Sequence, residues 1–101
     1  DVVAHGNTVY LVEVPQSLDG DIAMQTGEVL ASVEKLLAVA DSYKTRLLLV
    51  TIYLADMADY AGMSAVWDAW VSPGNTPARA TVEAKLAAPG LKVEIMVQAA
   101  K

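Results

Sequence analysis

The sequence has 101 residues, a length that fits a single domain, and we place that domain at residues 1–101. It contains no cysteine and one histidine, His5, which excludes disulfides, zinc–thiolate sites, thiol nucleophiles and multi-histidine metal centres. Seven basic and twelve acidic residues give a net charge of −5. This charge argues against a nucleic-acid partner held through its phosphates.

Hydrophobic residues make up 54% of the sequence, which is high for a single domain of this size. No apolar run is long enough to cross a bilayer. The sequence does not open on a basic segment followed by an apolar one, so we expect no signal peptide and a cytoplasmic location. The simplest interpretation of the apolar excess is an oligomer in which each subunit buries part of its surface.

The first half of the sequence predicts a hairpin and a long helix. Val2–His5 and Thr8–Val14 are typical of two strands joined by a turn at Gly6-Asn7. After Pro15 and a loop, a helix is predicted from about Asp21 to Ala40, with Asp19 or Asp21 as its cap. Its apolar positions recur every three or four residues and form one stripe: Ile22, Thr26, Val29, Leu30, Val33, Leu36, Leu37 and Ala40. This stripe should pack on a sheet.

The second half predicts three strands and a second helix. Arg46–Leu54 is almost continuously hydrophobic, which is typical of a strand buried on both faces. Asp59 is expected to cap a helix from Tyr60 to about Trp70. Ala78–Ala84 and Leu91–Ala99 alternate in polarity as strands do. In the last strand Val93, Ile95 and Val97 share one face, and Lys92, Glu94, Met96 and Gln98 share the other.

The predicted element order is β-β-α-β-α-β-β. It indicates an α+β domain in which two helices cover one face of a single mixed sheet. The other face then has no cover within the chain, which again favours an oligomer.

Two charged residues stand out in apolar surroundings. Arg79 begins a strand between two alanines, and it is either a solvated strand end or a fork that grips a carboxylate. Glu94 interrupts an apolar strand, and it is either an exposed glutamate beside Lys92 or a carboxylate that orients a water. The two lie on strands joined by a turn, so we expect them to be close.

Four segments match a known family. Thr51–Tyr60, Met63–Trp70, Pro77–Ala84 and Val93–Ile95 resemble the Rid family, the reactive intermediate deaminases of the RidA/YjgF group. Pro77-Ala-Arg79 followed by the Val-Glu-Ile strand is a specific signature, and the resemblance extends over nearly the whole sequence.

The resemblance implies a chorismate-mutase-like fold and a homotrimer with a central barrel and sites in the clefts between subunits. It implies hydrolysis of 2-imino acids, such as 2-iminopropanoate and 2-iminobutanoate, to 2-keto acids and ammonia, without cofactor or metal. By resemblance, Arg79 would hold the substrate carboxylate and Glu94 would orient the attacking water. Ser64 and Thr81 stand where relatives usually carry asparagine and cysteine, and they would complete the substrate site.

Other positions depart from the family pattern. Val12 and Glu13 stand where relatives usually carry a small residue and a glycine, and a glutamate there could fill the pocket and repel an anionic substrate. The outer face of the first helix should be charged. Instead, apolar or small residues gather there and just beyond its end: Met24, Gly27, Ala31, Ala38, Val39 and Tyr43. These residues reflect either ordinary sequence drift or a second protein–protein interface, natural or engineered.

Three functions therefore remain open: a trimeric imine deaminase, a module that binds keto acids without turnover, and a scaffold that assembles through its outer helix. Members of the family are also described as ribonucleases and translation inhibitors. The charge of −5 makes nucleic acid the weakest of these assignments.

Overall fold

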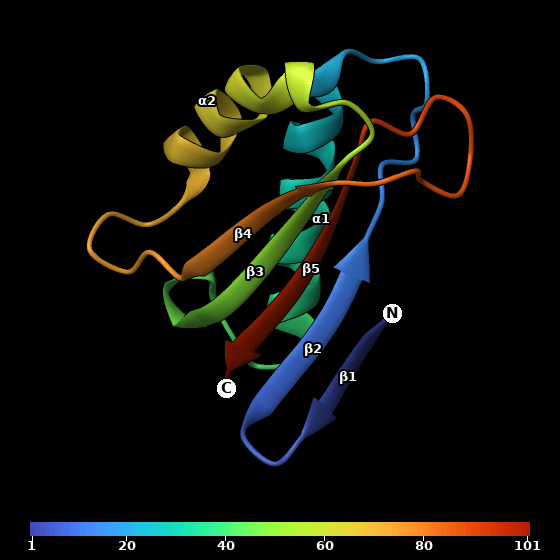
Figure 1. Ribbon diagram of the computed structural model, residues 1–101. Helices are drawn as coiled ribbons and strands as arrows, with labels where there is room; N and C mark the ends of the chain where they lie inside the picture. Colours follow the sequence, from blue (N-terminus) through green and yellow to red (C-terminus); the bar gives the residue numbers. More distant parts are fainter.

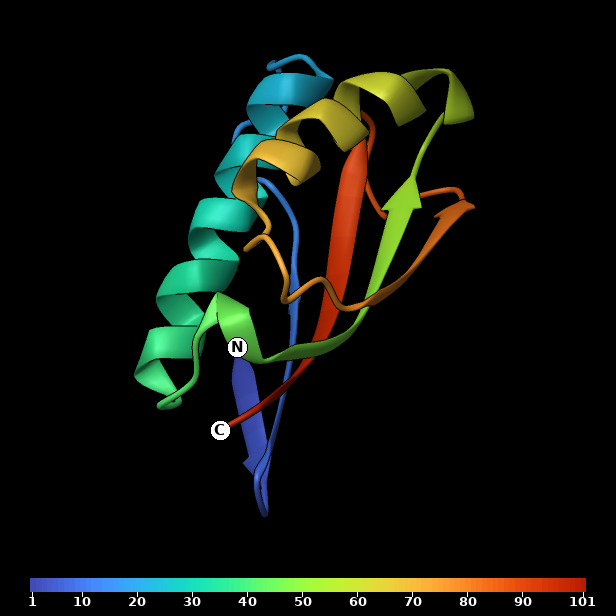
Figure 2. The same ribbon diagram turned by 90° about the vertical axis from the view of Figure 1, so that its left-hand side faces the viewer.

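Five strands form one sheet in the order β1-β2-β5-β3-β4 in a computed structural model that describes residues 1–101. Two helices lie on one face of this sheet, as the two views in Figures 1 and 2 show. The elements in chain order are β1 Val2–His5, β2 Thr8–Glu13, α1 Ile22–Val39, β3 Leu47–Leu54, α2 Tyr60–Trp70, β4 Ala78–Glu83 and β5 Val93–Ala100. Two short 3-10 turns, Lys44–Arg46 and Met57–Asp59, precede β3 and α2. The predicted α+β order is confirmed, and the predicted bounds lie close to the observed ones.

The strand pairing makes the sheet mixed. β3 and β4 run parallel, whereas the pairs β1–β2, β2–β5 and β3–β5 are antiparallel. The segment that contains α2 supplies the crossover that a parallel pair requires. β5 then enters the middle of the sheet, between β2 and β3, and leaves β4 at the edge. Consecutive strands β4 and β5 are therefore separated in space by β3.

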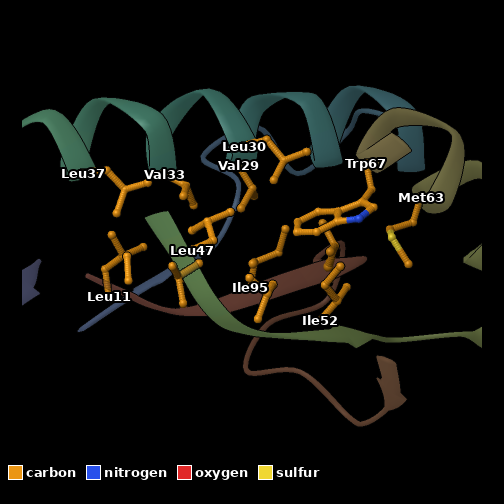
Figure 3. Close-up of a cluster of buried hydrophobic side chains, with 14 of the residues drawn as sticks. Leu11, Val29, Leu30, Val33, Leu37, Leu47, Ile52, Met63, Trp67 and Ile95 are labelled. Atoms are coloured by element: carbon orange, nitrogen blue, oxygen red, sulfur yellow. The ribbon is translucent and has the colours of Figure 1, made fainter. Parts of the chain in front are cut away.

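The core lies between the helices and the face of the sheet that they cover. Alternate residues of β5, from Val93 to Ala99, are buried because this strand presents every second side chain to the helices. Figure 3 shows Leu30 and Leu37 of α1 and Trp67 of α2 meeting the side chains of the sheet. The cluster comprises Val9, Leu11, Val29, Leu30, Val33, Leu37, Leu47, Val50, Ile52, Leu54, Met63, Trp67, Val93, Ile95, Val97 and Ala99. Burying each large side chain here stabilises the fold by about 1.5–3 kcal/mol.

The two helices begin in different ways. The side chain of Asp21 accepts a hydrogen bond from the backbone nitrogen of Met24 at 2.8 Å and so caps α1, as predicted. The predicted cap of α2 is wrong, because Asp59 makes no capping hydrogen bond. The chain enters α2 through a 3-10 turn, and Asp56 caps that turn by accepting from the nitrogen of Ala58 at 2.9 Å. Neither helix combines the length and the hydrophobicity needed to cross a membrane.

The second face of the sheet has no cover within the chain (Figure 2). Several large apolar residues are exposed on it: Val3, Tyr10, Val12, Leu49 and Val82. The prediction that β3 is buried on both faces is wrong for the single chain, because Val50 and Ile52 are buried but Leu49 is 38% exposed. The apolar sequence of β3 indicates that both of its faces favour burial. It does not indicate whether the covering surface belongs to the same chain.

Candidate functional site

Arg79 lies on the helix-covered face at the edge of the sheet. It is the second residue of β4 and stands in register with the buried Val50 of β3. Its guanidinium donates a hydrogen bond to the hydroxyl of Tyr60 at 2.9 Å. The same group lies 5.8 Å from the ring centre of Tyr60 and 5.6 Å from that of Trp67, within the range of cation–π attraction. Because β4 has no further strand beside it, this oriented cation borders the free edge of the sheet.

Two hydroxyls without partners share this region. Thr81 follows Arg79 by two residues and therefore faces the same side of β4. Ser64 lies on α2 between Tyr60 and Trp67, one helical turn from each. The side-chain oxygens of Ser64 and Thr81 are both buried and make no hydrogen bond. A buried polar group left without a partner costs about 1–3 kcal/mol, so each of these two oxygens lowers the stability of the single chain.

The structure thus brings together three of the four residues predicted for the site. We refer to Arg79, Thr81, Tyr60, Ser64 and Trp67 as the arginine cluster. Tyr60 was not among the predicted site residues, although its sequence position offers a signal. It precedes Ser64 by four residues and Trp67 by seven, which places all three on one side of a helix.

Glu94 lies on the other face of the sheet. It stands in register with Tyr53 of β3, which in turn pairs with Val82 of β4, so all three project from the uncovered face. Glu94 borders a cavity of about 550 Å³ between this face and the loop that joins β4 to β5. The walls are mostly apolar and come from Val12, Tyr53, Ala84, Lys85, Leu86, Ala87 and Met96. We refer to this space as the glutamate cavity.

The expectation that Arg79 and Glu94 are close within one chain is wrong. β3 lies between their strands, and the two side chains project from opposite faces of the sheet. The turn between β4 and β5 suggests neighbouring strands, but β5 joins the sheet on the far side of β3, so closeness in sequence does not give closeness in space here. The arginine cluster and the glutamate cavity of one chain therefore lie apart, on opposite faces of the sheet, and we refer to them as the two half-sites.

Glu13 lies away from the glutamate cavity, and its role in a cleft between subunits stays a prediction. Val12 stands in register with Met96 and lines the glutamate cavity, as expected for an open-face residue. Glu13 is in register with Ile95, which is buried under the helices, so its side chain belongs to the opposite face. Alternation along the strand separates these two neighbours. Glu13 does not fill the cavity beside Glu94.

The outer surface of α1 carries the predicted interface residues. Met24, Val39 and Tyr43 are 65%, 71% and 60% exposed. Ala31 and Ala38 are exposed as well, whereas Gly27 is half-buried. Large apolar side chains that are mostly exposed to water gain free energy when another surface covers them. The structure leaves this surface free, and what covers it stays a prediction.

The two tryptophans of α2 and the single histidine lie in different surroundings. Trp67 is buried, and Trp70 donates a hydrogen bond from its ring nitrogen to Glu34 at 2.9 Å. His5 ends β1 and is exposed. No three side chains of the histidine, cysteine, aspartate or glutamate type gather closely enough to hold a metal ion.

Comparison with known proteins identifies the family. The family profile described as Endoribonuclease L-PSP matches residues 1–101. The RutC family protein YoaB of Escherichia coli (strain K12) is 47% identical over 100 residues, which cover 99% of this chain and 88% of that protein. The chain belongs to the Rid/YjgF family. The family predicted from the four sequence segments is thereby confirmed.

Other Rid/YjgF relatives support the same assignment. A RutC family protein of Haemophilus influenzae is 46% identical over 99 residues, covering 96% of this chain and 85% of that protein. A crystal structure of a YjgF family member from Neisseria meningitidis has a TM-score of 0.96 at 46% identity, covering 99% of this chain and 84% of that one. A family member from Mycobacterium tuberculosis has a TM-score of 0.89 at 27% identity, covering 99% and 84%. The fold is thus the α+β fold of the Rid/YjgF family.

Proposed function

We propose that the chain hydrolyses 2-imino acids to 2-keto acids and ammonia at sites formed between copies of itself. The observation that carries the proposal is the arginine cluster at the free sheet edge. There the guanidinium of Arg79 is oriented by Tyr60 and Trp67, and two buried hydroxyls without partners lie nearby. A planar guanidinium suits a carboxylate because it can donate two parallel hydrogen bonds. Rid/YjgF membership and the Pro77-Ala-Arg79 signature favour the same substrate class.

A shared site requires the sheet edge of one copy to meet the glutamate cavity of another. The arginine cluster and the cavity occupy opposite faces, so the contact would join two different patches. A contact of this head-to-tail kind forms a closed ring when the rotation between copies permits it. The exposed apolar residues of the open face would be buried inside such a ring. A homotrimer with a central barrel is therefore the assembly that we propose.

The chemistry needs few groups. Arg79 would bind the carboxylate and fix the position of the adjacent imine carbon. Glu94 of the neighbouring copy would accept a proton from a water, whose oxygen attacks that carbon. The carbon–nitrogen bond then breaks, the nitrogen leaves as ammonia with the transferred protons, and the carbonyl oxygen comes from water. The imine carbon is already electrophilic, so positioning can supply most of the acceleration.

The test is release of ammonia and 2-keto acid from 2-iminopropanoate and 2-iminobutanoate generated in the assay. We expect Arg79→Ala and Glu94→Gln to abolish the rate above background. Arg46→Ala, at an exposed arginine outside both half-sites, should leave the rate unchanged. Saturable binding of 2-ketobutyrate without turnover would instead identify a keto-acid-binding module. A rate equal to that of the uncatalysed reaction would refute the enzyme.

A second candidate function is a scaffold that assembles through the outer surface of α1. The observation that favours it is the exposure of Met24, Val39 and Tyr43. Native mass spectrometry should then report species larger than one ring, and Met24→Glu or Ala31→Glu should reduce them to single rings, because an unpaired charge is costly to bury. Thr45→Glu, at an exposed residue outside this surface, serves as the control. A wild-type mass of one ring would remove this function.

A further inference from the structure

Gln25 is a buried polar residue that neither half-site uses. It lies in the first turns of α1 and is 1% exposed. A buried primary amide needs partners for both its nitrogen and its oxygen, because each group left unpaired costs free energy. The partners of Gln25 come from two other segments of the chain.

The hydrogen bonds of Gln25 join α1 to the end of the β4–β5 loop. Its side-chain nitrogen donates to the carbonyl oxygen of Gly90 at 2.8 Å and to that of Gly20 at 3.3 Å. Its side-chain oxygen accepts from the backbone nitrogen of Lys92 at 2.8 Å. One amide therefore holds the backbone on both sides of Leu91, next to the segment that enters α1, where Figure 1 shows the two loops side by side.

Gly90 brings the loop close enough for these bonds. Its backbone is in the left-handed region, with φ of +92°, which glycine adopts without strain. A β-carbon at this position would lie 3.0 Å from the carbonyl oxygen of Leu18. The loop therefore packs backbone against backbone here, and only a residue without a side chain fits.

The segment held in this way forms part of the glutamate cavity. Ala84 to Ala87 of the same loop line the cavity, and Glu94 follows Lys92 by two residues. The start of the loop is fixed separately, by a hydrogen bond from the nitrogen of Ala84 to the oxygen of Leu54 at 2.9 Å. At the other end of the loop, Gln25 acts together with a hydrogen bond from the nitrogen of Ala55 to the oxygen of Lys92 at 3.1 Å.

We propose that Gln25 is a positioning residue for the glutamate cavity: through Gly90 and Lys92 it fixes the loop that forms the cavity wall. It touches no substrate itself. Its effect on catalysis rests on the proposed function, whereas its effect on the loop does not. Hydrogen bonds from residues behind a binding site keep the groups that line it within the small range of positions that binding requires.

The first test measures the loop without reference to activity. Gln25→Leu removes the amide at similar volume, and Gln16→Leu makes the same change at an exposed glutamine. We expect amide hydrogen exchange at Leu91 and Lys92 to become about tenfold faster in Gln25→Leu, with the amide of Val33 in α1 unchanged. The methyl resonance of Met96, inside the cavity, should shift or broaden in Gln25→Leu alone. Exchange and resonance equal to those of Gln16→Leu would overturn the proposal.

The second test compares the effect of Gln25→Leu on KM with its effect on kcat. We expect Gln25→Leu to raise KM for the imino acid about tenfold and to change kcat less than about threefold, since Glu94 itself is held by strand pairing with Tyr53. A faster-exchanging loop with unchanged KM would overturn the positioning role. If the wild-type protein hydrolyses no imine, the proposed function fails, and the Met96 resonance decides the role of Gln25 alone.

A variant in the loop itself provides a second test that does not depend on the folding of Gln25→Leu. Gly90→Ala forces the loop away from Leu18 and leaves Gln25 intact. It should accelerate exchange at Lys92 and move the Met96 resonance in the same way as Gln25→Leu. Normal exchange at Lys92 in a folded Gly90→Ala protein would contradict the proposed coupling.

Discussion

The two faces of the sheet are built from the same strands, yet helices of the same chain cover only one of them. On the helix-covered face Ile95 is completely buried, with α1 and α2 above it. On the open face its neighbour Met96 is half-buried and borders a cavity. The covered face therefore contributes most of the burial that stabilises the single chain. The open face can contribute as much only when another surface covers it.

Each face also carries one half of the proposed chemistry. Arg79 belongs to the covered face, but it lies at the sheet edge, where the cover ends. Glu94 belongs to the open face, beside a cavity whose walls are largely apolar. A catalytic unit that combines them would make assembly and activity inseparable.

The largest effect is expected from a charge placed on the open face, which tests whether another copy covers that face. Val82 is 44% exposed there, on the edge strand. We expect Val82→Asp to reduce the native mass to one chain and to abolish imine hydrolysis, because an unpaired carboxylate is costly to bury between copies. The far-UV circular dichroism should keep the signal of a folded chain. An assembled and active Val82→Asp protein would contradict a ring closed through this face.

Two alanine variants on β5, one on each face, compare how much the two faces contribute to the free energy of unfolding. We expect Ile95→Ala to lower the free energy of unfolding by about 2–5 kcal/mol at any protein concentration, because its cover is within the chain. The loss for Met96→Ala should depend on protein concentration, since in the proposed assembly another copy completes the cover of that side chain. Urea denaturation at several concentrations measures both. Equal and concentration-independent losses would show that the faces do not differ in this way.

Within the covered face, the geometry of the guanidinium can be tested by a conservative change. Arg79→Lys keeps the charge but loses the planar fork that Tyr60 and Trp67 orient. We expect kcat/KM to fall about tenfold to a hundredfold, the equivalent of one charge-assisted hydrogen bond. Arg46→Lys provides the control. An unchanged rate would mean that a point charge suffices and that the fork has no role.

The smallest expected effect concerns the two aspartates once expected to act alike. Asp21→Ala should lower the free energy of unfolding by about 1 kcal/mol, because it removes the cap of α1. Asp59→Ala should change it by less than about 0.5 kcal/mol, since that side chain caps nothing. Thermal unfolding of both variants at one concentration measures the difference. A larger loss for Asp59→Ala would show that it has a contact outside the helix cap.

Much of the fold was predictable because local patterns decided it. The spacing of apolar residues predicted α1 and α2, and alternation in Val93–Val97 predicted which side chains of β5 are buried. The arginine cluster was predictable in part, since Arg79 and Thr81 share one face by alternation. Tyr60 was missed, although helical spacing from Ser64 and Trp67 points to it.

By itself the sequence determined the elements, their buried faces and the family. The order of the strands in the sheet was decided only by the tertiary structure, because a strand pattern records which side chains avoid water but not which strand lies alongside. That order separates Arg79 from Glu94 by the width of β3, and the register of the strands places them on opposite faces. It also brings Gly90 and Lys92 to Gln25, a contact across 65 and 67 residues that no local pattern encodes.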